Sequence, residues 1–300
     1  MRETAQDDIG QALLRAFAEQ GYEAALPDLH TISVRLPDGT TANADISAWR
    51  DHAANAGPGA LQEAAAGYAA QAAAAFGRGS ERIRDQDLRM RLYTDDALGE
   101  MRDSLVTRRL APGLIETVVV DYPDSIMPLD RARLGDAPQD AAFGAAVAHS
   151  LAEEHYASTS SVGGVPVTHI GGTHRYVGAH AHVLRRHTGQ APYGALVSFP
   201  LPEYVLVHEI GGEAHLFAAM EAVQDLSRRL YDTGDKALSP QVYWWRPGRH
   251  EELPEAEALR SGLVPDLRPV GVQVDHQERS VAFQSADTGE LAELWMRDHG

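Results

Sequence analysis

Histidine is the residue type in this chain whose abundance and spacing could support chemistry. The sequence contains 14 histidines, and nine of them lie between His149 and His215. Imidazole titrates near neutral pH and is the commonest metal ligand in proteins, so this density favours a metal or acid–base interpretation. No two histidines of the group are three or four residues apart, which is the spacing that stacks side chains on one helix face. A metal site would therefore need ligands from several elements.

The histidines that are closest in sequence do not predict a chelate within one helix. His180 and His182 would point about 200° apart on a helix. His180 and His187 share a helix face but would lie about 10 Å apart along the axis. The metal hypothesis that remains combines His174, His180 and His208 from different elements. Hydrogen-bonded or solvated histidines are the simpler interpretation.

Residues 207–212 contain a His-Glu step like that of zinc proteases. The second histidine of such a helix is replaced by Gly212, and two successive glycines do not suit a helix interior. In a strand, the His208 side chain points to the same side as Ile210 and away from Glu209. We therefore expect His208 to be a core histidine with one hydrogen bond.

Other catalytic signatures are absent from the sequence. It has no serine in a glycine elbow, no phosphate-binding loop and no dinucleotide fingerprint. The cysteine count of zero excludes disulfides, thiolate metal ligands and cysteine nucleophiles. The leading hypothesis is a noncatalytic binding or adaptor protein without a cofactor. The alternative is a metal-dependent, hydrolase-like enzyme that uses histidines near Gly171-Gly172.

Charge and hydropathy restrict the class of partner. A formal net charge of −17 disfavours nucleic-acid binding, which requires clustered Lys and Arg. No stretch approaches the roughly 18 consecutive apolar residues of a membrane span, and residues 1–8 are polar, so we expect a cytoplasmic protein. The negative net charge predicts a partner protein of basic character, such as the one that an immunity-type protein neutralises. Trp244-Trp245 is the candidate contact surface, because neighbouring strand residues face opposite sides and one tryptophan could be exposed. Burial of both is the alternative.

The first 80 residues are expected to form a separate part of helices and a hairpin. Residues 8–20 have helical apolar spacing, and 31–46 read as a hairpin with its turn at Asp38-Gly39. The alanine-rich stretch that follows is broken at Gly57-Pro58-Gly59 into two helices. Residues 77–80 resemble a linker and place a domain boundary at residue 80.

Residues 81–300 are expected to form a larger α+β domain with mainly antiparallel sheet. Strands are predicted at 88–93, 115–120 and 165–170, with a loop at 158–164. Residues 195–199 and 204–210 read as an antiparallel pair. Helices are predicted at 140–155, 179–188, 213–231 and 289–295.

The order of these elements resembles the YtpQ family, bacterial cytoplasmic proteins of unknown function. The resemblance lies in the helix Phe143 to Glu153, in residues 171–184 and in the strands from Ala195 to Ile210 that lead into the long helix. It covers roughly the last two thirds of the chain and implies the same α+β fold.

The chain departs from the family at the turn after Gly171-Gly172. The family has an acidic, glycine-containing motif and a serine there, and this chain has His174-Arg175-Tyr176 and Ala179-His180. We predict a binding role for residues around this turn and beyond it: His174, Arg175, Tyr176, His208 and Trp245.

Overall fold

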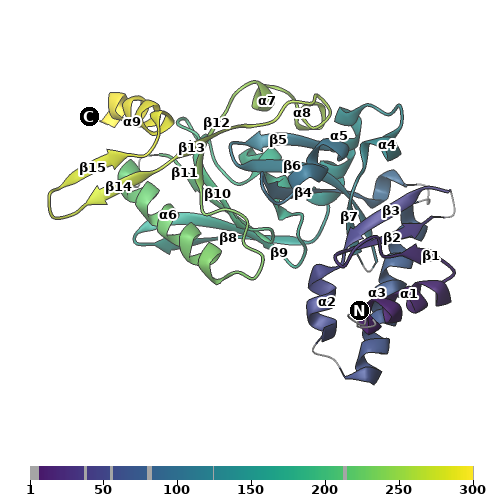
Figure 1. Cartoon of the computed structure of the whole chain (residues 1–300). Helices are drawn as coiled ribbons and strands as arrows, with labels where there is room; N and C mark the ends of the chain where they lie inside the picture. Colours follow the sequence, from purple (N-terminus) through teal and green to yellow (C-terminus); the bar gives the residue numbers. More distant parts are fainter. Residues whose placement is uncertain are drawn as a thin grey trace. The chain divides into compact units, whose positions relative to one another are not determined.

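The computed structural model describes residues 7–36, 39–54, 57–79, 83–123, 125–211 and 215–299. It divides the chain into two compact units, Met1–Arg82 and Ile83–Gly300, where the sequence placed a boundary at residue 80. Parts of several predicted features lie outside the described residues: Asp38, Ser80, Gly212 and Glu213. Figure 1 labels the helices and strands of both units.

The first unit is a three-stranded antiparallel sheet with three helices. Its order is α1 (Asp8–Glu19), β1 (Glu23–Ala25), β2 (Thr31–Arg35), β3 (Thr41–Asp45), α2 (Ser47–Ala54) and α3 (Pro58–Gly79). Asp7 caps α1 by accepting a hydrogen bond from the backbone N–H of Gly10, and its carboxylate also pairs with Arg50 of α2. Leu13, Phe17 and Ile32 are buried between helices and sheet and form the core of this unit.

The second unit contains two larger antiparallel sheets, so the α+β class with mainly antiparallel pairing is confirmed. One sheet has the order β4-β6-β5, with β7 also paired to β6. Its strands are β4 (Leu88–Thr94), β5 (Thr107–Ala111), β6 (Leu114–Tyr122) and β7 (Ser125–Pro128). The other has the order β13-β12-β10-β11-β9-β8. Its strands are β8 (His155–Val162), β9 (Val165–Gly172), β10 (Ala195–Leu201), β11 (Tyr204–Glu209), β12 (Val242–Arg246) and β13 (Asp266–Val270).

Helices and short 3-10 segments connect and cover these sheets. They are η1 (Asp85–Asp87), η2 (Gly99–Ser104), α4 (Arg131–Leu134), α5 (Gln139–Leu151), η3 (Val177–Arg186), α6 (Leu216–Thr233), α7 (Arg249–Glu252), α8 (Glu255–Ala258) and α9 (Ala286–His299). The hairpin β14 (Val272–Asp275) and β15 (Ser280–Phe283) precedes α9. Within the described residues, no helix has the length and apolar character needed to cross a membrane.

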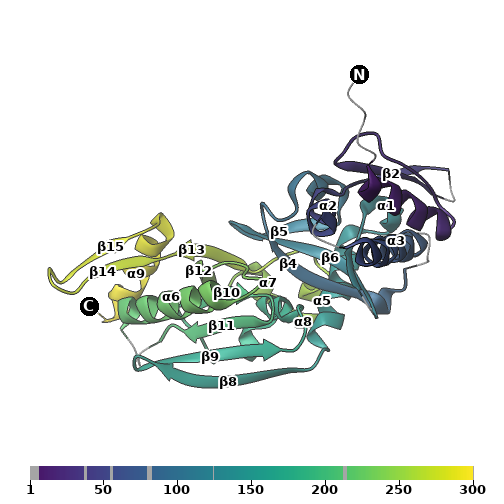
Figure 2. The ribbon, with the colours of Figure 1, turned by 60° about the horizontal axis from the view of Figure 1, so that its bottom comes forward.

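The six-stranded sheet separates two cores because its side chains alternate between its faces. On β12, Tyr243 and Trp245 enter a core shared with β4, β6, α5 and η3, whereas Trp244 enters the core beneath α6 and α9. α6 lies across this second face in both ribbon views (Figures 1 and 2). Because of this alternation, Trp245 and Trp244 lie in different cores, on opposite faces of the sheet.

Two local predictions are wrong. Residues 158–164 were expected to be a loop, but 155–162 form β8, because an unbroken register with β9 supplies backbone partners that local Ser and Gly content cannot indicate. The helix expected at 179–188 is instead a 3-10 segment with non-helical backbone angles at Val183. That kink changes where the histidines of η3 lie.

Candidate functional site

A buried carboxylate in the centre of β6 begins the candidate site. Glu116 is completely buried, and its neighbours on the strand, Ile115 and Thr117, are buried as well. The register of β5 places Arg108 opposite it, and Arg108 Nε donates to Glu116 Oε2 over 2.5 Å. The Arg108 guanidinium lies 4.2 Å from the centre of the Phe143 ring. On its other oxygen, Glu116 accepts a short hydrogen bond from His182 Nε2 of η3.

These contacts shift the pKa values of Glu116 and His182. Burial opposes ionisation of Glu116, but the charges and hydrogen bonds of His182 and Arg108 outweigh it and lower the pKa of Glu116 to about 2. Burial also lowers the pKa of His182, although the Glu116 carboxylate opposes this effect. At neutral pH Glu116 is therefore a carboxylate, and His182 Nε2 is the donor of the hydrogen bond that it accepts.

The opposite nitrogen of His182 faces a second histidine. His182 Nδ1 lies 3.4 Å from Nε2 of His250 on α7, and His250 Nδ1 lies 3.1 Å from Glu251 Oε1. Glu251 is held in place by two further donors, the Trp245 indole Nε1 at 3.0 Å and the Gly248 backbone N–H at 2.8 Å. Burial opposes its ionisation, but the hydrogen bonds from His250, Gly248 and Trp245 lower the pKa of Glu251 overall.

Glu116, His182, His250 and Glu251 form a continuous series of polar contacts. The carboxylates at its ends, Glu116 and Glu251, each take an N–H from the adjacent imidazole. Because each imidazole directs one N–H at a carboxylate, His182 Nδ1 and His250 Nε2 face each other with no hydrogen between them unless one ring gains a second proton. If the His250 proton were on Nε2, it would be donated to His182 Nδ1, but His250 Nδ1 would then face the Glu251 carboxylate without a hydrogen. One additional cation or proton can therefore be held between His182 Nδ1 and His250 Nε2.

A small cavity gives access to this place. Its volume is about 130 Å³, and it is lined by His182, His250 and Glu251 together with the apolar side chains of Val183, Leu184, Leu253 and Ala258. Arg185 and Glu255 also line it, and Glu255 is paired with Arg186. At about 30 Å³ for each water molecule, the cavity has room for roughly four.

A second histidine group consists of His180 within η3, His187 directly after it and His155 of β8. His180 Nδ1 lies 2.9 Å from His187 Nε2, and the His155 ring centre lies 4.3 Å from that of His180. The expectation that His180 and His187 would be 10 Å apart is wrong, because the segment is not a regular α-helix and its backbone is non-helical at Val183. Burial and neighbouring positive charge lower the pKa of His180 to about 3 and that of His187 to about 4.

The three histidines predicted to share a metal do not form one group. His208 is paired with Leu196 on the face of the sheet covered by α6, and its Nδ1 donates to the Pro166 carbonyl over 2.7 Å. η3, with His180, lies on the opposite face, within the other core. Gly171 of β9 pairs with Tyr204, and Gly172 ends the strand, so the glycines do not approach His208.

The other predicted binding residues have local partners. His174 stacks against Tyr176, with ring centres 5.5 Å apart, and Arg175 pairs with Glu203 over 3.5 Å. Trp245 is 1% exposed and Trp244 is 0% exposed, so neither is a contact surface. Trp245 instead donates a hydrogen bond to Glu251 and so orients the carboxylate that faces His250. Among the described residues, no group of three or more His, Asp or Glu is arranged to hold a metal ion.

Five residues that were not predicted from the sequence come together in this site: Arg108, Glu116, His182, His250 and Glu251. One signal was present, since Glu116 interrupts the apolar run of β6 and a carboxylate there must be paired if it is buried. The partners could not be identified from spacing, because His182 and His250 are 68 residues apart.

No family model, curated protein or solved structure matches the chain.

Proposed function

We propose that the protein is a noncatalytic binding protein that pairs strand β8 with an extended segment of a basic partner protein. β8 is the last strand of the six-stranded sheet and pairs with β9 alone among the described residues. Figure 2 shows it at the open side of the sheet. Seven of its eight residues are exposed, and this long free edge is the observation that carries the proposal.

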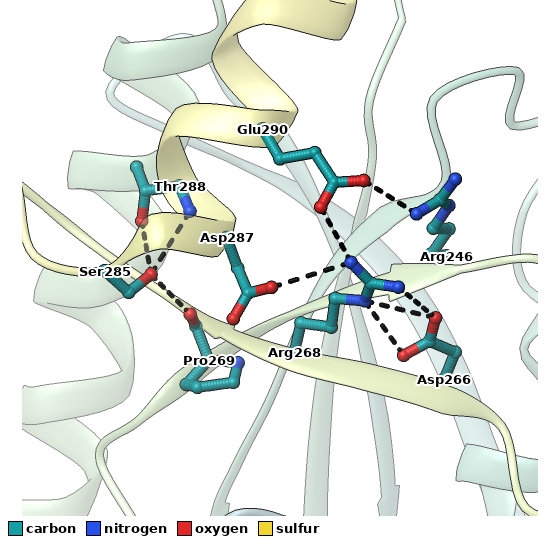
Figure 3. Close-up of polar contacts among 8 residues, drawn as sticks. All are labelled: Arg246, Asp266, Arg268, Pro269, Ser285, Asp287, Thr288 and Glu290. Carbon is teal, nitrogen blue, oxygen red and sulfur yellow. Dashed lines mark hydrogen bonds and ion pairs between the residues drawn. The ribbon is translucent and has the colours of Figure 1, made fainter.

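The edge lacks the features with which proteins block strand addition. Residues 155–162 contain no Asp, Glu, Lys, Arg or Pro, and their register with β9 has no bulge. The opposite edge of the same sheet differs. On β13, Pro269 lacks an N–H, and Arg268 pairs with Asp266 and with Glu290 of α9 (Figure 3). Of the two described edges of this sheet, the β8 edge is therefore the one that combines length, exposure and absence of charge.

Side-chain contacts hold β8 in the extended form that strand addition needs. Thr159 and Thr168 hydroxyls are 2.9 Å apart, and Ser160 Oγ lies 2.8 Å from His169 Nε2 on β9. Tyr156 donates to Tyr204 over 2.8 Å. Because the strand is already ordered, a peptide that pairs with it loses less entropy on binding.

The net charge indicates which kind of protein supplies the segment. A chain with a formal charge of −17 repels its own copies and attracts cationic proteins, and this attraction accelerates encounter. The uncharged β8 edge then provides backbone pairing without a charge of its own. A cytoplasmic location and membership of the YtpQ family belong to the same proposal.

The experiment compares two double variants of equal charge. Ala157→Lys/Ser161→Lys adds charge to β8, and Ser280→Lys/Ala282→Lys adds the same charge to exposed positions of β15. Each tagged protein and the wild type are used for affinity purification from native-host lysate, and retained proteins are quantified. Hydrogen exchange of 155–162 is then measured with the purified partner.

We expect the wild type and the β15 variant to retain one stoichiometric basic protein, and the β8 variant to lose it. The amides of β8 should exchange more slowly in the complex. Absence of a stoichiometric partner, or equal retention by all three proteins, would contradict the proposal. So would a wild-type dimer in light scattering that the β8 variant alone abolishes, because the occupant would then be a second copy.

A further inference from the structure

We propose that His182 Nδ1 and His250 Nε2 are two ligands of a divalent transition-metal site of the zinc type. This inference is independent of the proposed binding function. It differs from the metal set predicted from the sequence, since it uses neither His174 nor His208. It rests on the positions of the two imidazoles, on the carboxylates behind them and on the cavity beside them.

The separation of the two nitrogens fits a shared ion. Zinc binds imidazole at about 2.0–2.1 Å in tetrahedral geometry, which places two ligand nitrogens roughly 3.3 Å apart. His182 Nδ1 and His250 Nε2 are 3.4 Å apart. An imidazole that donates one N–H to a carboxylate has its other nitrogen available as a metal ligand, so both nitrogens are positioned to bind one cation.

Each imidazole has the orienting partner that metal-bound histidines require. His182 donates from Nε2 to Glu116, and His250 donates from Nδ1 to Glu251. A carboxylate behind a metal-binding histidine fixes its tautomer and increases the basicity of the ligating nitrogen. The Trp245 and Gly248 donors in turn fix Glu251. The ligating nitrogens are thus selected before an ion binds.

The cavity supplies the remaining coordination positions. Its volume of about 130 Å³ accommodates the water molecules or small oxygen ligand that complete a four-coordinate ion. Two charge pairs limit the local charge, because Arg108 balances Glu116 and Arg186 balances Glu255. The Glu251 carboxylate remains to offset a bound cation, while Arg185 at the rim opposes it.

Zinc and cobalt are the probes for this site. Isothermal titration of the full-length protein measures zinc affinity and stoichiometry, and cobalt absorption reports tetrahedral coordination. His250→Gln removes one ligand. His187→Gln is the matched control, because it removes a buried histidine of the other group, which lies 2.9 Å from His180. Glu251→Gln removes only the carboxylate behind His250.

We expect one zinc ion per chain, with affinity reduced about tenfold or more by His250→Gln and by Glu251→Gln and unchanged by His187→Gln. If a variant does not fold, imidazole ¹⁵N spectra of the wild type replace it, and zinc should shift His182 Nδ1 and His250 Nε2. Absence of zinc binding, or loss of binding through His187→Gln alone, would overturn the inference. Zinc-independent ¹⁵N spectra that show only a proton shared by the pair would also overturn it.

Discussion

At the scale of single residues, the two histidine groups of η3 differ in what their surroundings provide. His182 has a carboxylate on one side and an imidazole on the other, so its tautomer is fixed. His180 and His187 have each other and the His155 ring, and neither is hydrogen-bonded to a carboxylate of the residues that the structure describes. The first group can accept a cation, whereas burial and neighbouring positive charge resist protonation of the second.

The second group should make stability fall with acidification in a defined window. In the unfolded chain histidine has a pKa near 6.5, and in the fold the pKa of His180 is about 3 and that of His187 about 4. Between these values the unfolded state binds more protons, so the free energy of unfolding decreases as pH falls below about 6.5. The slope approaches about 1.4 kcal/mol per pH unit for each such group.

Urea unfolding at a series of pH values from 6.5 to 4.5 checks this, since most carboxylates remain ionised there. His187→Gln should flatten the profile, because one suppressed imidazole is removed. His276→Gln, at an exposed site paired with Glu221, should leave it unchanged. Parallel profiles for the wild type and His187→Gln would show that this group does not control the acid sensitivity.

At the scale of elements, backbone crowding fixes how β10 meets its neighbours. Gly194 precedes β10 with a φ of +79°. A Cβ there would lie 1.9 Å from the Trp245 carbonyl oxygen of β12. The position of β12 also matters for the candidate site, because Trp245 on this strand orients Glu251. A glycine is therefore required at this position for two reasons, its backbone conformation and the close approach of β12.

Gly194→Ala should lower the free energy of unfolding by roughly 3 kcal/mol, because the added methyl group displaces backbone of the adjacent strand. Gly163→Ala is the matched control. Gly163 also has a positive φ, +58°, but a Cβ there meets nothing within 4 Å. The control should cost about 1 kcal/mol, from backbone strain alone. Equal losses in chemical denaturation would show that the contact with Trp245 is unimportant.

At the scale of the whole molecule, each compact unit has its own core. Leu13, Phe17 and Ile32 belong to the core of the first unit. The second unit has the two cores on either side of its six-stranded sheet. It contains both β8 and the His182–His250 pair. Both proposals therefore concern residues 83–300.

A fragment of residues 83–300 should fold by itself, because the apolar clusters of this unit are built from its own residues. We expect a single cooperative thermal transition and strong near-ultraviolet circular dichroism from the buried Trp244 and Trp245. The separately expressed fragment 1–82 is the companion sample. A fragment 83–300 without near-ultraviolet signal would show that its packing depends on the first 82 residues.

The sequence by itself determined what local pattern can encode. Apolar spacing predicted the class of fold, the first helix and the long helix of the second unit, and the charge suggested the character of a partner. Helix and strand periods are local properties, so one segment is enough to express them.

Tertiary structure decided the site and the surface. The pairing of Arg108 with Glu116 follows from strand register, and that of His182 with His250 joins residues 68 positions apart. The exposed strand β8 was unrecognisable in a run of serines, because its conformation depends on hydrogen bonds to β9. Contacts between distant segments place each of these groups, and no spacing within the chain specifies such contacts.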